Sequence, residues 1–98
     1  MIVKVHKNER GAIILAVCDK SLIGQVFSEG NKQLNVDSDF YGGEEVNEDE
    51  AGDLMRNANI INIVGDKAIN LALREEIIEK ENIKTIAEIP YAQVILEL

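Results

Sequence analysis

The stretch from residue 60 to residue 86 constrains the fold most, because its apolar pattern changes period twice. Residues 60–64 form a short apolar run that ends at Gly65. Residues 66–80 then carry apolar side chains at helical spacing, and residues 83–86 return to the pattern of a strand. A strand, a glycine turn, a helix and a strand within about 27 residues match the length of a βαβ unit. The pattern therefore predicts parallel strands near residues 62 and 84 in one sheet, joined by a right-handed crossover.

The N-terminal residues predict a β-hairpin. Val3 and Val5 alternate with Lys4 and His6, which is typical of a strand with one wetter face. Residues 8–11 supply a turn, and residues 12–18 are apolar on both faces, as expected of a strand covered on both sides.

The middle of the chain predicts shorter elements. A short helix over residues 19–27, capped by Asp19, precedes a strand over residues 32–36 and a loop over residues 37–46. Asn47, with Glu50 three residues later, then indicates the start of an amphipathic helix that continues to Ala58. A final strand is expected over residues 92–96.

These elements predict an α/β or α+β fold. We expect one domain over residues 1–98, with a small mixed sheet, an N-terminal hairpin, a βαβ unit and two to three helices. A length of 98 residues, 46% of them hydrophobic, is enough for one core. The longest apolar run has seven residues, too few for a membrane span, so we expect a cytoplasmic protein that does not insert into membranes.

Charge is the most unusual part of the composition. The net charge is −8, and residues 36–58 alone carry eight acidic residues against one basic residue. Such a chain is not expected to bind phosphate backbones directly, and we predict a basic partner instead. A ribosomal or other translation component would have suitable charge.

The aromatic-Gly loop, residues 40–45, is the most distinctive local segment. It comprises Phe40, Tyr41, Gly42, Gly43, Glu44 and Glu45. Two aromatic side chains beside a glycine pair can anchor a partner, while the alternative is that both rings plug the edge of a small core. These six residues are our candidate partner-binding site.

Two further patterns suggest a ligand less strongly. Gly65, between a strand and a helix, resembles a phosphate-binding turn, but Asp66 places a carboxylate there and the fuller glycine motifs are missing. His6 is the single imidazole and the only candidate acid or base near neutral pH, although we expect it on the surface. Cys18 lies among apolar residues, so we expect it to be buried, unreactive and too far from His6 to form a catalytic pair.

Residues 37–48 come close to a calcium-loop pattern. The following residues occupy loop positions 1, 3, 6, 9 and 12: Asp37, Asp39, Gly42, Glu45 and Glu48. Tyr41 is a poor ligand at position 5, Glu44 replaces an apolar residue, and a strand rather than a helix leads into the loop. We therefore predict a solvated acidic loop, with no metal site and no cofactor.

Four short motifs together resemble an archaeal family. They are Ala16-Val17-Cys18-Asp19, Phe40-Tyr41-Gly42-Gly43-Glu44, Asn62-Ile63-Val64-Gly65 and Ala92-Gln93-Val94. In this order and spacing they resemble the family catalogued as domain of unknown function number 424. The resemblance extends over nearly the whole chain and implies a small, stand-alone archaeal cytosolic protein, without catalytic residues to transfer.

Two classes of function follow from these patterns. The leading hypothesis is a non-catalytic binding or adaptor module that meets a basic partner through its acidic surface and the aromatic-Gly loop. The alternative is an enzyme that binds a small molecule or nucleotide at the Gly65 helix start and uses His6. Direct RNA binding ranks third, because residues 1–35 carry a net charge of only +2.

Overall fold

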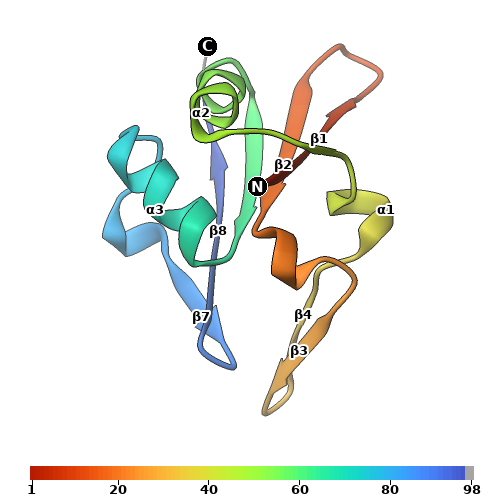
Figure 1. Ribbon diagram of the computed structural model, residues 1–98, viewed down its shortest axis with the longest axis vertical. Coiled ribbons are helices and arrows are strands. Elements are labelled where there is room, and N and C mark those ends of the chain that lie inside the picture. Colours follow the sequence, from red (N-terminus) through yellow and green to blue (C-terminus); the bar gives the residue numbers. More distant parts are fainter. Residues whose placement is uncertain (97–98) are drawn as a thin grey trace.

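A computed structural model describes residues 1–96 and contains one mixed six-stranded sheet with the two nine-residue helices on one face (Figure 1). The strands, in their order across the sheet, are β5 (Glu44–Glu45), β1 (Ile2–Lys7), β2 (Ile13–Cys18), β6 (Ile60–Val64), β8 (Ile89–Ile95) and β7 (Lys84–Ile86). The helices α2 (Glu48–Arg56) and α3 (Asp66–Arg74) lie in front of the sheet in Figure 1. The fold is therefore a small α+β domain with a mixed sheet, within the predicted class.

The predicted hairpin and crossover are both present. β1 pairs antiparallel with β2, and the side chain of Asn8 closes the turn by accepting hydrogen bonds from the amides of Arg10 and Ala12 at 2.9 and 3.0 Å. β6 and β7 both run antiparallel to β8, so they are parallel to each other in one sheet, as predicted, with β8 between them. The direct parallel neighbour of β6 is β2.

Helix α2 also follows the prediction, whereas α3 is shorter than expected. The Asn47 side chain accepts a hydrogen bond from the Glu50 amide at 2.9 Å, which satisfies one of the free donors at the start of α2. α3 ends at Arg74 instead of residue 80, because Glu76 adopts a positive φ of 58° and turns the chain. A short 3₁₀ turn, η2 (Lys80–Asn82), then leads into β7.

The predicted helix over residues 19–27 is wrong. This segment holds a 3₁₀ turn, η1 (Lys20–Leu22), and then β3 (Val26–Glu29), which pairs with β4 (Lys32–Asn35) in a separate two-stranded sheet. Gly24 breaks the helical path with a φ of 80°. Asp19 does not cap the segment that follows it, because its carboxylate bonds to α3 instead.

Two hydrophobic clusters lie on opposite faces of the six-stranded sheet. Successive strand residues point to opposite faces, so Leu15 and Val17 join the cluster under α2 and α3, while Ala16 and Cys18 join the other. The second cluster is covered by η1, the β3–β4 hairpin and the four-residue helix α1 (Ser38–Tyr41). Residues 37–46, predicted as a loop, thus contain α1 and the edge strand β5.

The second face is covered over only part of its length. Ile14, Ile60 and Ile95 lie side by side across β2, β6 and β8, and they belong to neither cluster. Ile95 is 71% exposed. The row nearer the hairpin β3–β4, which contains Cys18 and Val64, is buried.

Candidate functional site

The aromatic part of the aromatic-Gly loop is directed mostly inward. Tyr41 is 8% exposed and belongs to the second cluster with Ile2, Cys18 and Val36. The Phe40 ring is half-buried and meets the Tyr41 ring edge-on, with 5.1 Å between the ring centroids. Tyr41 is therefore a core residue that cannot offer its ring to a partner, which corrects its place among the candidate partner-binding residues.

Two side chains of β1 hold the end of α1. His6 stacks on Phe40 with 4.7 Å between ring centroids, and its Nε2 atom donates to the Phe40 carbonyl at 2.9 Å. Lys4 donates from Nζ to the Asp39 carbonyl at 2.7 Å. His6 is thus half-buried, and its ring is already stacked and hydrogen-bonded within the chain. Val5, predicted on the drier face, is 46% exposed.

The glycine pair allows the chain to run close to β1. A Cβ atom on Gly43 would lie 2.9 Å from the carbonyl carbon of Val3 and 3.0 Å from the Cα atom of Lys4. A Cβ atom on Gly42 would lie 3.1 Å from the carbonyl carbon of Ser38. The glycines therefore permit close backbone contacts within the chain, and they leave Glu44 and Glu45 exposed on the edge strand β5.

All eight acidic residues of the acidic segment, residues 37–53, are exposed. Three of them form ion pairs: Glu45 with Lys20 at 3.2 Å, Glu48 with Arg74 at 3.1 Å, and Asp53 with Arg56. Within residues 1–96 the other five have no ion-pair partner; they are Asp37, Asp39, Glu44, Asp49 and Glu50. The acidic segment thus presents a surplus of carboxylates to solvent.

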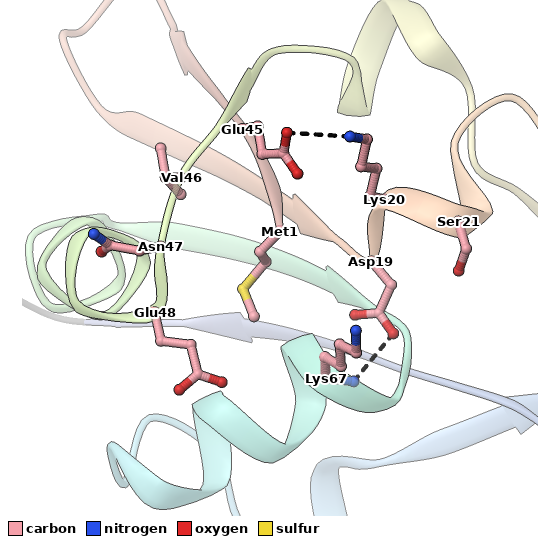
Figure 2. A pocket seen from close by; sticks show the side chains of 9 residues that line it. All are labelled: Met1, Asp19, Lys20, Ser21, Glu45, Val46, Asn47, Glu48 and Lys67. Carbon is pink, nitrogen blue, oxygen red and sulfur yellow. Dashed lines mark hydrogen bonds and ion pairs between the residues drawn. The ribbon is translucent and has the colours of Figure 1, made fainter.

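A cleft of about 800 Å³ borders the acidic segment at the carboxyl ends of β2 and β6 (Figure 2). Its lining includes Glu45 and Glu48 from the acidic segment, Asp19 and Lys20 after β2, and Lys67 in α3. In open α/β sheets ligands commonly bind at this end of parallel strands. The cleft carries both signs of charge, and the Lys20–Glu45 ion pair lies across one side of it.

Asp19 occupies the anion-binding position at the start of α3. Its two carboxylate oxygens accept hydrogen bonds from the backbone amides of Lys67 and Ala68 at 3.1 and 2.9 Å. Gly65 has a φ of 108°, and a Cβ atom there would lie 2.6 Å from Oδ2 of Asp19. The Gly65 turn therefore accommodates a carboxylate of this chain, and it offers a phosphate no free amide at these two positions.

The alternative ligand site is not assembled. His6 is four residues along β1 from Ile2, whose strand partner Cys18 is next to Val64 and hence to Gly65. Four strand residues span about 13 Å, so His6 and Gly65 lie at opposite ends of the sheet. Cys18 is likewise separated from His6, because His6 pairs with Ile14, and the predicted absence of a Cys-His pair is confirmed.

Burial changes the acidity of two groups on the second face. Cys18 is fully buried, as predicted, and burial together with the neighbouring Asp19 carboxylate raises the pKa of its thiol to about 11. Burial, and to a smaller extent the nearby Cys18 side chain, raises the pKa of Tyr41 to about 12. At neutral pH both groups are uncharged, so neither supplies a nucleophile or a base.

The calcium-loop residues serve other contacts. Asp37 caps α1 by accepting a hydrogen bond from the Asp39 amide at 2.9 Å, and Glu45 and Glu48 form ion pairs with different cations. In the described part of the chain no group of three or more His, Cys, Asp or Glu side chains is placed to hold a metal ion. No helix within residues 1–96 is long and apolar enough to cross a membrane.

The fold and this surface define a small α+β protein with an acidic edge, and comparison with known proteins identifies its family. The model of a family described as "Protein of unknown function (DUF424)" matches residues 6–96, so the chain belongs to that family. No curated protein matches the chain. A crystal structure of an uncharacterized conserved protein from Methanopyrus kandleri has a similar fold, with a TM-score of 0.81, 22% identity, and coverage of 95% of this chain and 88% of that one.

Sequence reasoning missed the role of Asp19. An acidic residue directly after a strand that is buried on both faces, together with a glycine after a second such strand, was the available signal. Because Asp19 and Gly65 are 46 positions apart, their contact depends on the parallel pairing of β2 and β6, which local patterns did not reveal.

Proposed function

We propose that this protein is a non-catalytic binding module whose acidic segment binds a basic protein. The observation that carries the proposal is the exposure of all eight carboxylates of that segment, five of them without an ion-pair partner in residues 1–96. Complementary charge of this kind steers association and selects partners by sign. A basic ribosomal or translation protein in the cytoplasm has the required charge.

Helix energetics explains only part of this charge. Glu48, Asp49 and Glu50 lie in the first turn of α2, where the helix dipole favours carboxylates. Glu44 has no such reason to be acidic, since it lies on the two-residue edge strand beside Gly43. It is the residue of the aromatic-Gly loop on which the proposal depends most.

Paired charge reversals test this function. The tagged protein and two double variants, Glu44→Lys/Asp49→Lys and Glu9→Lys/Glu81→Lys, are used to capture proteins from native lysate of the source organism. Both variants change the net charge equally, but Glu9 and Glu81 lie outside the acidic segment. We expect basic proteins to be retained by the wild type and the second variant, to be lost by the first, and to dissociate as salt is raised.

Equal capture by both variants would overturn the proposal. A fold control is needed because Lys at position 49 opposes the helix dipole, so far-UV circular dichroism and urea unfolding of both variants accompany the capture.

The cleft of Figure 2 favours a second candidate function, the binding of a small molecule that carries both charges. Lys67 and Lys20 provide cations there, and Glu45 and Glu48 provide carboxylates. Thermal-shift screening of amino acids and nucleotides, with Lys67→Ala as the variant expected to lose the shift, tests this candidate.

A further inference from the structure

The outer edge of β1 is only partly paired in this fold. β5 pairs with Ile2 and Val3 alone, although β1 continues to Lys7. The carbonyl of Met1 points outward and accepts a hydrogen bond from the Val46 amide at 2.9 Å. The Asn8 amide points inward, toward the β2 side, and donates to the Ala12 carbonyl. Because backbone groups alternate along a strand, Val5 and Lys7 direct their N–H and C=O groups outward. On this outer side no strand within residues 1–96 pairs with Val5 or Lys7, whose strand partners in β2 lie on the inner side.

An apolar groove of about 380 Å³ accompanies this free edge. It is lined by Val3, Lys4, Val5, Gly43, Glu44 and Leu54. Val5 is 46% exposed at the middle of the edge. An exposed apolar side chain on an unpaired strand edge favours association with another chain. Backbone groups and an apolar groove together are the two features that β-strand addition uses, the first for affinity and the second for side-chain specificity.

Charge selects the kind of segment that would bind here. Glu44 lines the groove and has no ion-pair partner among the described residues. Glu50 lies one turn before Leu54 on α2, so it is on the same side of that helix and is also unpaired. A basic side chain on the added strand would reach these carboxylates, while an apolar side chain two residues away enters the groove between Val5 and Leu54.

We propose that the edge of β1 at Val5 and Lys7 binds an extended segment of a basic protein by β-strand addition, with apolar and basic side chains two residues apart on the face of the strand that meets the groove. This inference rests on the proposed function and specifies how the partner binds. It assigns the hydrogen bonds to the backbone of Val5 and Lys7, the apolar contact to the groove, and the charge selection to Glu44 and Glu50.

The experiment uses a defined probe with matched controls. The probe is the peptide acetyl-Lys-Thr-Val-Thr-Lys-Thr-Val-Thr-Lys-amide, which puts lysine and valine two residues apart on one face of a strand. The first control has the same sequence with both valines N-methylated, which keeps the charge and removes their N–H groups. The second control replaces every lysine by glutamate. Binding to ¹⁵N-labelled protein is followed by chemical-shift changes. We expect the probe to shift Val5, Lys7 and Glu44 most, and to leave Gln93 on the second face unchanged.

Protein variants separate this inference from the general proposal. Val5→Thr keeps the β-branched shape but loses a methyl contact, and Val26→Thr makes the same change at a valine with a similar exposure of 52%. Losing one buried methyl group corresponds to about a fourfold weaker probe affinity for Val5→Thr, and Val26→Thr should bind as the wild type does.

Each result decides the question in one direction. Binding of the probe that is lost on N-methylation and weakened by Val5→Thr supports strand addition. Equal binding of the N-methylated peptide, or no binding of the probe, overturns it. In either of those cases the proposed function still stands if Glu44→Lys/Asp49→Lys loses basic proteins from lysate, and it fails separately if that capture is unchanged.

Discussion

The two faces of the six-stranded sheet are covered by different kinds of structure. α2 and α3, each nine residues long, cover the first face with regularly spaced apolar side chains. The second face is covered by a 3₁₀ turn, a two-stranded hairpin and the four-residue helix α1, and part of it stays open at Ile14, Ile60 and Ile95. The first face is built by local periodicity, and the second by contacts between residues distant in sequence.

Tyr41 shows how such distant contacts hold the second face. α1 is too short to be stable alone, and it is fixed by the burial of Tyr41 and by the bonds from Lys4 and His6 to its carbonyls. The first face has a matching residue in Met55, which is fully buried in α2. The two residues allow the faces to be compared by the same kind of truncation.

Tyr41→Ala should have the largest effect, lowering the free energy of unfolding by about 3 kcal/mol or more, as truncation of buried aromatic residues generally does. Met55→Ala should cost about 2 to 5 kcal/mol by the same mechanism. Urea unfolding followed by circular dichroism measures both. A loss below about 1 kcal/mol for Tyr41→Ala would show that the second face is a loose cover and would restore Tyr41 as a candidate contact residue.

Gly65→Ala should have the next largest effect, lowering stability by about 2 to 3 kcal/mol. The change forces a positive φ of 108° on a residue with a side chain and pushes its Cβ atom against the Asp19 carboxylate. Gly11→Ala is the matched control, because Gly11 has a φ of 79° but nothing within 4 Å of a Cβ atom. Its cost should be about 1 kcal/mol, the backbone part alone.

Asp19→Gly in the Gly65→Ala background isolates the contact between the two residues. Removing the carboxylate relieves the clash, so the double variant should be more stable than the sum of the two single losses predicts. Strictly additive losses would mean that Gly65 is needed for its backbone conformation only.

Sequence reasoning succeeded for the elements that local patterns determine and failed for those that depend on contacts between distant residues. The hairpin, the strand β6 and the capped helix α2 were predictable because their signals are local: alternation, an apolar run, and Asn47 three residues before Glu50. The parallel relation of β6 and β7 was also predictable, because the crossover length limits the topology.

The second face could not be predicted for an equally physical reason. Leu22, Ile23, Val26 and Phe27 have helical spacing, yet the last two belong to β3, where Val26 pairs with Asn35 and Phe27 with Leu34. This segment forms a strand instead of a helix because of that pairing and because of the positive φ of Gly24, and neither is visible in the local pattern. For the candidate site, the sequence located the acidic segment and the glycine pair, but it did not show that Tyr41 is buried or that Asp19 fills the start of α3.

The two helix caps should differ in a way that reflects the two faces. Asn47→Ala should lower stability by about 1 kcal/mol, because an amide at the start of a nine-residue helix loses its acceptor. Asp37→Ala should cost less, about 0.5 kcal/mol, because α1 is held from outside and its exposed amide can bond to water. Urea unfolding of both variants checks the order, and a larger loss for Asp37→Ala would mean that α1 depends on its own cap.

The last effect should be absent at neutral pH and should appear only in alkali, from groups on the second face. The folded chain keeps the Cys18 proton up to a pKa of about 11, while the unfolded chain releases it near the ordinary thiol pKa of 9.0. Between these values the folded state binds more protons than the unfolded state, so the free energy of unfolding falls as pH rises, and it is unaffected below about pH 9. Tyr41 extends the fall, since its pKa is raised from 10.0 to about 12. Urea unfolding from pH 7 to pH 11 should therefore give a shallower decline for Cys18→Ala than for the wild type. Met55→Leu, a change on the first face, should leave the slope unchanged. Parallel curves for wild type and Cys18→Ala would show that the thiol is hydrated in the folded state, and hence that the irregular cover of the second face admits water where the helices of the first face exclude it.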